Sequence, residues 1–206
     1  MLSVQSLVCR RNGKTIFRDV SFSLKGGDML IITGTNGSGK TSLLRQLAGL
    51  LPVSAGTIAW EGRPINDDMS AYRQCLQFVG HLEAVKAELT VRETLNYWRL
   101  LHGQEKPGDL TGCLSVFDLE GLIDQPVRRL SAGQKRRLGL SRLLLNPVPL
   151  WLLDEPGTSL DKDSAVKLVD AVNRHCANGG MVVVVTHHDI GLKPTQNFQL
   201  TRKASV

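Results

Sequence analysis

The chain lacks any long hydrophobic run, although 42% of its 206 residues are apolar. A helix that spans a bilayer needs about 20 consecutive apolar residues, and the most apolar region, residues 143–153, contains an asparagine and two prolines. The beginning of the sequence also lacks the basic and apolar regions of a secretory signal. We therefore expect a soluble, cytoplasmic protein with one domain over residues 1–206.

Paired cysteines are missing as well. The four cysteines are scattered and form no C-x-x-C pair, so the sequence predicts neither a zinc site nor a disulfide framework. We expect reduced and mostly buried thiols. The formal net charge of +6 favours anionic partners, namely nucleotide, nucleic acid or an anionic membrane surface, and it does not choose among them.

Short strands and helices alternate along the chain, with no internal repeat and no low-complexity segment. Apolar patterning predicts strands over residues 2–8, 20–24, 29–33, 57–61, 150–153 and 181–185, with a turn at Asn12-Gly13. It predicts helices over residues 41–50, 90–102, roughly 110–120 and 164–176, and another that begins near residue 131. This alternation is typical of an α/β layer fold.

The stretch of residues 82–135 is predominantly helical and interrupts the series of predicted strands. Thr90 and Glu93 have the spacing of a capping box, and Ser131 and Gln134 repeat it. A polar Gly/Pro stretch over residues 103–109 separates two of the predicted helices. We therefore predict a helical subdomain inserted into the single domain.

A glycine-rich loop, Gly-Thr-Asn-Gly-Ser-Gly-Lys-Thr, occupies residues 34–41 between a predicted strand and a predicted helix. This is the pattern of a phosphate-binding loop, because glycines let backbone N–H groups converge on phosphate oxygens at a helix start. We predict that Lys40 meets the β- and γ-phosphates and that Thr41 holds Mg²⁺. A chance glycine turn is the alternative, and the strand–loop–helix setting argues against it. The predicted ATP-binding residues of this segment are Asn36, Gly37, Ser38, Gly39, Lys40, Thr41 and Ser42.

Two carboxylates follow the apolar strand over residues 150–153. Because successive side chains of a strand point in opposite directions, Asp154 and Glu155 can take different roles. We predict that Asp154 holds Mg²⁺, directly or through water, and that Glu155 polarises the attacking water as general base. A solvated acidic turn is the alternative, and a neighbouring phosphate-binding loop makes it the weaker interpretation.

The segment Leu-Ser-Ala-Gly-Gln over residues 130–134 offers a hydroxyl and free N–H groups at a predicted helix start. Alone, it is better interpreted as a helix cap. In sequence order with the two motifs above, it resembles the signature sequence of the ATP-binding-cassette family, with alanine for the commoner glycine. Ser-Leu-Asp over residues 159–161 resembles the D-loop of that family, and His187 resembles its switch histidine. The resemblance spans nearly the whole chain.

This resemblance implies the fold of a P-loop NTPase, with a RecA-like parallel sheet core and an antiparallel β edge. It also implies a head-to-tail homodimer with two ATP molecules at the interface, and ATP and Mg²⁺ as cofactors. The implied catalytic residues are Lys40, Glu155 and His187, with His187 at the γ-phosphate. The residues implied to reach ATP from the opposite subunit are Ser131, Gly133, Gln134 and Asp161.

Two positions depart from the family pattern. The family places an aromatic side chain on the adenine, whereas this chain has Arg11, whose guanidinium can stack on a base. The Q-loop glutamine of the family falls on His81. A neutral imidazole can still reach water or Mg²⁺, but the charge of His81 depends on pH. A loop residue without contact to the site is the alternative for His81. His188 is predicted to be an exposed neighbour.

These departures, the signature sequence and the short chain resemble one branch of the family, the ATP-binding subunits of the cytochrome c maturation system, or haem exporters. The branch implies an ATPase that joins integral membrane subunits at the cytoplasmic face of the inner membrane and does not act on nucleic acid. An ATPase subunit for a transporter of another solute is the alternative. DNA-acting relatives insert a long coiled coil, for which residues 82–135 are too few. The presence of Glu155 and His187 argues against a binding module without activity.

Overall fold

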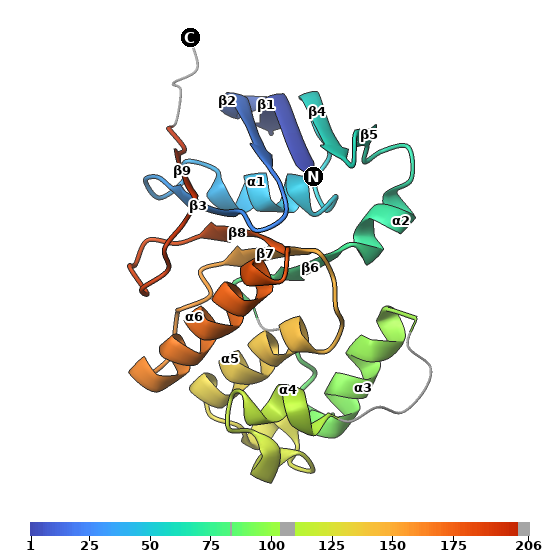
Figure 1. The fold of residues 1–206 in the computed structure, drawn as a ribbon, viewed down its shortest axis with the longest axis vertical. Helices are drawn as coiled ribbons and strands as arrows, with labels where there is room; N and C mark the ends of the chain where they lie inside the picture. Colours follow the sequence, from blue (N-terminus) through green and yellow to red (C-terminus); the bar gives the residue numbers. More distant parts are fainter. Residues whose placement is uncertain (83, 104–109, 202–206) are drawn as a thin grey trace.

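The computed structural model describes residues 1–82, 84–103 and 110–201, which form two sheets and a set of helices (Figure 1). The strands are β1 Leu2–Arg11, β2 Lys14–Leu24, β3 Met29–Thr33, β4 Ala55–Trp60, β5 Arg63–Pro64, β6 Leu76–Val79, β7 Leu150–Asp154, β8 Met181–Val185 and β9 Gln196–Gln199. The helices are α1 Lys40–Leu47, α2 Met69–Gln74, α3 Val91–Leu101, α4 Thr111–Ser115, α5 Ala132–Ser141 and α6 Lys162–Ala177, with short 3₁₀ turns η1 Glu120–Leu122, η2 Val127–Arg129 and η3 Arg142–Leu144. Among these described residues, no helix is long and apolar enough to cross a membrane.

The antiparallel sheet has the strand order β2-β1-β4-β5. Its first two strands form a hairpin in which Arg11 pairs with Lys14 across Asn12 and Gly13. Both turn residues have positive φ, 48° and 72°, which is the conformation of a two-residue type I′ turn. The turn predicted at Asn12-Gly13 is confirmed, and the strands around it are longer than predicted, so that Arg11 lies at the hairpin tip.

The parallel sheet has the strand order β6-β7-β8-β3-β9, and every described pair within it is parallel. The carboxyl ends of all five strands therefore lie at one edge. Ligand sites of α/β proteins lie at this edge, because the loops that leave the strands converge there. The segments that follow β3, β6, β7 and β8 are brought together in this way.

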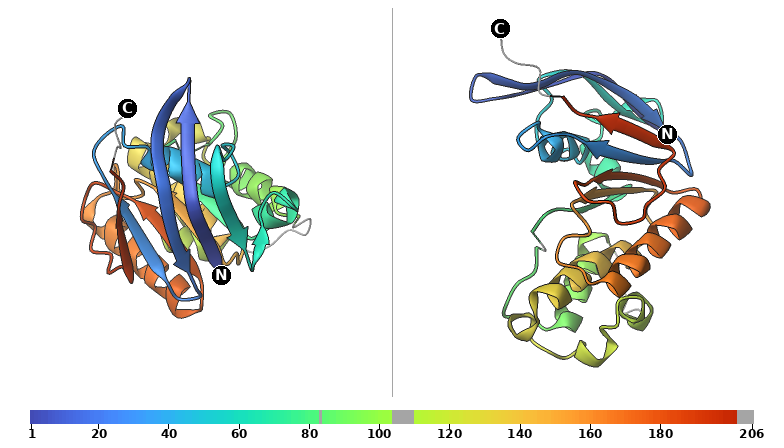
Figure 2. Two further views of the ribbon diagram at one scale, coloured as in Figure 1. Left: turned by 90° about the horizontal axis from the view of Figure 1, so that it is seen from above. Right: turned by 90° about the vertical axis from the view of Figure 1, so that its left-hand side faces the viewer.

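Both faces of the parallel sheet are covered (Figure 2). On one face α1 buries Leu43, Leu44 and Leu47 between the two sheets. On the other face α6 and the helices α3 to α5 pack in a second apolar core. Strands buried on both faces read as continuous apolar runs, and β7 and β8 are buried at every position. The predicted α/β layer fold is confirmed.

Helices α3, α4 and α5 gather at the end of the molecule far from the antiparallel sheet (Figure 1). The start of α3 has the predicted capping box, because the Glu93 N–H donates to Thr90 Oγ1 at 3.2 Å and the Thr90 N–H donates to Glu93 Oε2 at 2.8 Å. The segment predicted as one helix over residues 110–120 is instead α4 followed by η1. Asp118 separates them with a left-handed φ of 52°. Most of the polar stretch predicted over residues 103–109 lies outside the described residues.

The sequence patterns did not predict helix α2, the strands β5, β6 and β9, or the 3₁₀ turn η2. Strand β6 has four residues and β9 has four, which is too short for a period of two to stand out from chance. Helix α2 has six residues and begins at an Asp68 cap, whose side chain accepts the Ala71 N–H at 2.9 Å. Strand β6 matters for function, because it leads directly to His81.

Candidate functional site

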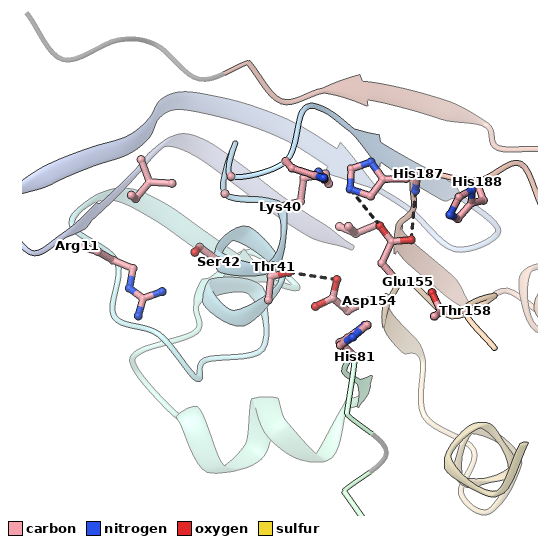
Figure 3. A pocket seen from close by; sticks show the side chains of 15 residues that line it. Arg11, Lys40, Thr41, Ser42, His81, Asp154, Glu155, Thr158, His187 and His188 are labelled. Carbon is pink, nitrogen blue, oxygen red and sulfur yellow. Dashed lines mark hydrogen bonds and ion pairs between the residues drawn. The ribbon is translucent and has the colours of Figure 1, made fainter. Parts of the chain in front are cut away.

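A cavity of about 530 Å³ opens at the carboxyl edge of the parallel sheet (Figure 3). Its walls come from the loop after β3, from the segments after β6, β7 and β8, and from the tip of the β1–β2 hairpin. The lining residues are Arg11, Ile16, Asn36, Gly37, Gly39, Lys40, Thr41, Ser42, His81, Asp154, Glu155, Thr158, Val185, His187 and His188. The structure thus brings together most of the site residues predicted for one subunit.

The loop after β3 folds around glycines in conformations that other residues rarely adopt. Gly39 is the N-cap of α1 with φ 101°, and a Cβ added there would lie 2.5 Å from Ile16 Cγ2. Gly37 has φ 77°. Such backbone forms a concave array of N–H groups at a helix N-terminus, which is a general anion site. Ser38 is fully buried, and the cavity lining does not include it.

Lys40 is a nearly buried cation, with 6% of its surface exposed. Its ammonium donates to the Gly34 carbonyl at 2.8 Å and to the Thr35 carbonyl at 3.0 Å. Burial lowers the pKa of Lys40, and the negative charges of Glu155 and Asp154 oppose this shift. The side chain is therefore held against its own loop by two carbonyl groups that a phosphate can replace as acceptors.

Thr41 and Asp154 bring two side-chain oxygens together in the cavity lining. Thr41 Oγ1 donates to Asp154 Oδ1 at 3.3 Å, and Asp154 has only 2% of its surface exposed. Burial raises the pKa of Asp154, and the hydrogen bond from Thr41 opposes the shift. Hydroxyl and carboxylate oxygens suit Mg²⁺. The described residues contain no group of three or more His, Cys, Asp or Glu side chains that could hold a metal.

The buried carboxylate of Asp154 should cost folding stability when it is ionised. Because the pKa of Asp154 is raised, the cost is present above this raised pKa and disappears as the pH falls through it and the carboxyl takes up a proton. We expect Asp154→Asn to raise the melting temperature of the nucleotide-free protein at pH 7. The rise should be about 2–4 °C for each kcal/mol relieved. Differential scanning fluorimetry checks it, with the exposed Asp67→Asn as control; a lower melting temperature for Asp154→Asn would contradict it.

Glu155 and His187 lie next to each other in the cavity lining (Figure 3). Glu155 Oε2 accepts the His187 N–H at 3.2 Å, and Glu155 Oε1 lies 3.4 Å from His187 Nε2. The backbone of Glu155 is left-handed, with φ 49°. Asp154 and Glu155 thus have different partners, as strand alternation predicts, and the Glu155 carboxylate can accept a proton from a water in the cavity.

His81 and Arg11 lie at the rim of the cavity and both are exposed. In Figure 3, His81 is next to Asp154, while Arg11 lies at the far end from Glu155 and His187. The charge of His81 acts to lower the pKa of Asp154. This position disfavours the alternative that His81 is a loop residue without contact to the site.

Sequence reasoning missed two polar residues of the cavity, Thr158 and His188. His188 is exposed as predicted, and it also lines the cavity. Thr158 follows Glu155 by one turn, and its N–H donates to the Glu155 carbonyl at 3.2 Å. The available signal for Thr158 was the Pro156-Gly157 pair, because Pro and Gly favour a β-turn, and this turn places Thr158 close to Glu155.

The residues predicted to act from the opposite subunit do not line this cavity: Ser131, Gly133, Gln134 and Asp161. Ser131 is the N-cap of α5, where its Oγ accepts the Gln134 N–H at 3.2 Å and its N–H donates to Gln134 Oε1 at 2.8 Å. Asp161 is the N-cap of α6 and accepts the Ser164 N–H at 2.7 Å; hydrogen bonds from Ser164 lower the pKa of Asp161. The signature segment therefore lies outside the cavity of its own chain.

Comparison with known proteins identifies the class to which this fold and site belong. Residues 17–158 match the family model described as ABC transporter. The chain belongs to the ATP-binding proteins of the ABC transporter family, and it is an ABC-type ATPase that binds ATP. The resemblance that the sequence motifs suggested is confirmed.

Within this class, similarity over nearly the whole chain leads to one group. The cytochrome c biogenesis ATP-binding export protein CcmA of Paramagnetospirillum magneticum is 46% identical over 205 residues, which are 98% of this chain and 94% of that protein. CcmA of Escherichia coli O157:H7 is 39% identical over 211 residues, covering 100% of this chain and 99% of that protein. The chain is therefore of the CcmA type.

Solved structures share the fold. The ATP-binding subunit of an ABC transporter superposes with a TM-score of 0.84 at 25% identity, over 91% of this chain and 79% of that chain. An ATP-binding cassette solved as a dimer in a post-hydrolysis state with ADP and phosphate has a TM-score of 0.81 at 23% identity, over 91% of this chain and 88% of that chain. The predicted fold class, a parallel core with an antiparallel edge, is confirmed.

Proposed function

We propose that this chain is the ATP-hydrolysing subunit of a membrane export complex for cytochrome c biogenesis, a haem exporter. The observation that carries the proposal is the cavity, in which the phosphate-binding loop, two carboxylates and His187 meet at one sheet edge. The CcmA relatives, similar over nearly the full chain, support the choice of branch.

The chain would act as a head-to-tail homodimer. Each cavity holds one set of site residues and lacks the signature segment, whose Ser131 and Gln134 are at the N-terminus of α5. Ser131 Oγ accepts one hydrogen bond in its capping box, and a hydroxyl keeps its proton free to donate to phosphate. In the dimer, Ser131, Gly133, Gln134 and Asp161 of the partner subunit would close the cavity over ATP.

Thr41 and Asp154 would hold Mg²⁺, because their oxygens already lie 3.3 Å apart. His81 would lie beside this metal site, at the rim of the cavity. Bound Mg²⁺ would neutralise charge on the phosphate oxygens. Lys40 would exchange its two carbonyl acceptors for the β- and γ-phosphates. Glu155 would orient a water and accept its proton, while His187 contacts the γ-phosphate. The rim residue Arg11 would stack on adenine.

Membrane subunits would be the other partners, with the chain bound peripherally at the cytoplasmic face of the inner membrane. The helices of residues 82–135 would form the inserted subdomain. The test is co-expression with the cytochrome c maturation membrane proteins, followed by affinity purification from detergent. Co-purification with ATPase stimulation supports the proposal, whereas stimulation by the membrane subunits of another transporter would favour another solute.

His81→Gln should change the response to the membrane subunits rather than the affinity for ATP. His81 is exposed at the cavity rim, two residues after the end of β6, and the amide of glutamine can donate and accept hydrogen bonds as a neutral imidazole does, so the affinity for ATP should stay largely unchanged. The measurement is ATP affinity, together with ATPase rates with and without the membrane subunits. A large loss of ATP affinity would show that His81 has another role.

A further inference from the structure

Arg136 is a cation buried in the interior, with 1% of its surface exposed. It lies on α5 two residues after Gln134, the end of the signature segment. A buried guanidinium is costly unless its N–H groups are satisfied. Its acceptors therefore show what the residue holds in place.

The guanidinium of Arg136 donates to carbonyls of two segments that form the cavity. Its Nη2 donates to the Glu155 carbonyl at 2.6 Å and to the Asp154 carbonyl at 3.3 Å, and its Nε donates to the Pro156 carbonyl at 3.3 Å. Its Nη1 donates to the Gly80 carbonyl at 3.0 Å. One side chain thus joins the segment after β7 to the residue that precedes His81.

These contacts fix a strained part of the backbone. Glu155 has a left-handed φ of 49°, a conformation that a non-glycine residue keeps only when its surroundings enforce it. Its N–H donates to the Val185 carbonyl at 2.8 Å, and its carbonyl accepts from Arg136. The peptide groups on both sides of the Glu155 side chain are therefore anchored, one of them by α5.

We propose that Arg136 is a positioning residue that couples the signature helix to the carboxylate of Glu155 in the same chain. The signature at the start of α5 would contact one ATP of the dimer, while Glu155 serves the other. If α5 shifts when the signature binds its ATP, the guanidinium of Arg136 would shift with it. The hydrogen-bonded carbonyls of residues 154–156 would then move as well. The inference rests on the proposed role of Glu155 as base.

The test uses Arg136→Lys and Arg136→Met in the full-length chain. Lysine keeps the charge but presents a compact ammonium instead of a planar fork, and methionine fills space without donating. We expect kcat to fall about 10–100-fold, as for a catalytic group displaced by about 1 Å, while the KM for ATP stays within about threefold. Arg92→Lys is the control, because Arg92 is exposed and pairs with Asp124.

A double-mutant cycle separates positioning from a general structural role. If Arg136 acts through Glu155, adding Arg136→Lys to Glu155→Gln should lower the residual turnover by less than about twofold. A kcat for Arg136→Lys equal to wild type would overturn the proposal. It would also be overturned by a parallel loss of ATP affinity and melting temperature, or by additive losses in the cycle. Full activity of Glu155→Gln would instead remove the proposed base, whatever Arg136 does.

Discussion

Glu155→Gln should lower ATP turnover by roughly 10²–10⁴-fold, the contribution of a positioned general base. The amide cannot accept the proton of the attacking water, but it keeps the size of the carboxylate. Its oxygen can still accept the His187 N–H, which lies 3.2 Å from Glu155 Oε2 in the wild-type chain. Binding of ATP should therefore continue while hydrolysis stops, and ATP-bound dimers should accumulate.

Phosphate release measured at saturating ATP gives the turnover, and light scattering after size-exclusion chromatography gives the dimer. Glu120→Gln is a suitable control, because Glu120 is exposed in η1 and lies outside the cavity lining. Retention of full turnover by Glu155→Gln would mean that another group acts as base.

Lys40→Ala should weaken binding of ATP by about 10–100-fold, since hydrogen bonds to charged groups contribute roughly 1.5–3 kcal/mol. In the structure the ammonium of Lys40 donates to the Gly34 and Thr35 carbonyls at 2.8 and 3.0 Å. ATP must therefore replace two existing hydrogen bonds. The measured loss will report the advantage of phosphate over these carbonyls, and it will be smaller than the full strength of the phosphate contacts.

Isothermal titration calorimetry of ATP against wild type and Lys40→Ala measures this loss directly. Lys25→Ala provides a control that removes the same charge from an exposed turn. An unchanged affinity in Lys40→Ala would contradict the assignment of the phosphate-binding loop.

Local patterns explain which parts of the fold could be predicted from the sequence. The bounds of β3 and β8 match the predicted strands, because both are continuous apolar runs bounded by glycine or polar residues. The caps at Thr90 and Ser131 were predictable, because a capping box depends on residues only three positions apart. Strand β6 was not predicted, because its four residues become a strand only by pairing with β7.

The same distinction holds for the site. The phosphate-binding loop and the two carboxylates carry their chemistry in a few consecutive residues, so the sequence indicated them one by one. The structure brings them together, because β3 and β7 end at the same edge of the parallel sheet. Arg136 carries no such signal. Its acceptors at Gly80 and Glu155 are 56 and 19 residues away, and only the folded chain brings the three segments together.

The signature segment lies outside the cavity of its own chain, and the ATPase activity should therefore depend on the concentration of the subunit. If the site is completed only by a second copy, a subunit that is monomeric at low concentration has an incomplete ATP site and should be inactive, although it carries all of the proposed catalytic side chains. Membrane subunits that hold two copies side by side would raise their local concentration and relieve this dependence by mass action. Unassembled subunits in the cell would then consume little ATP.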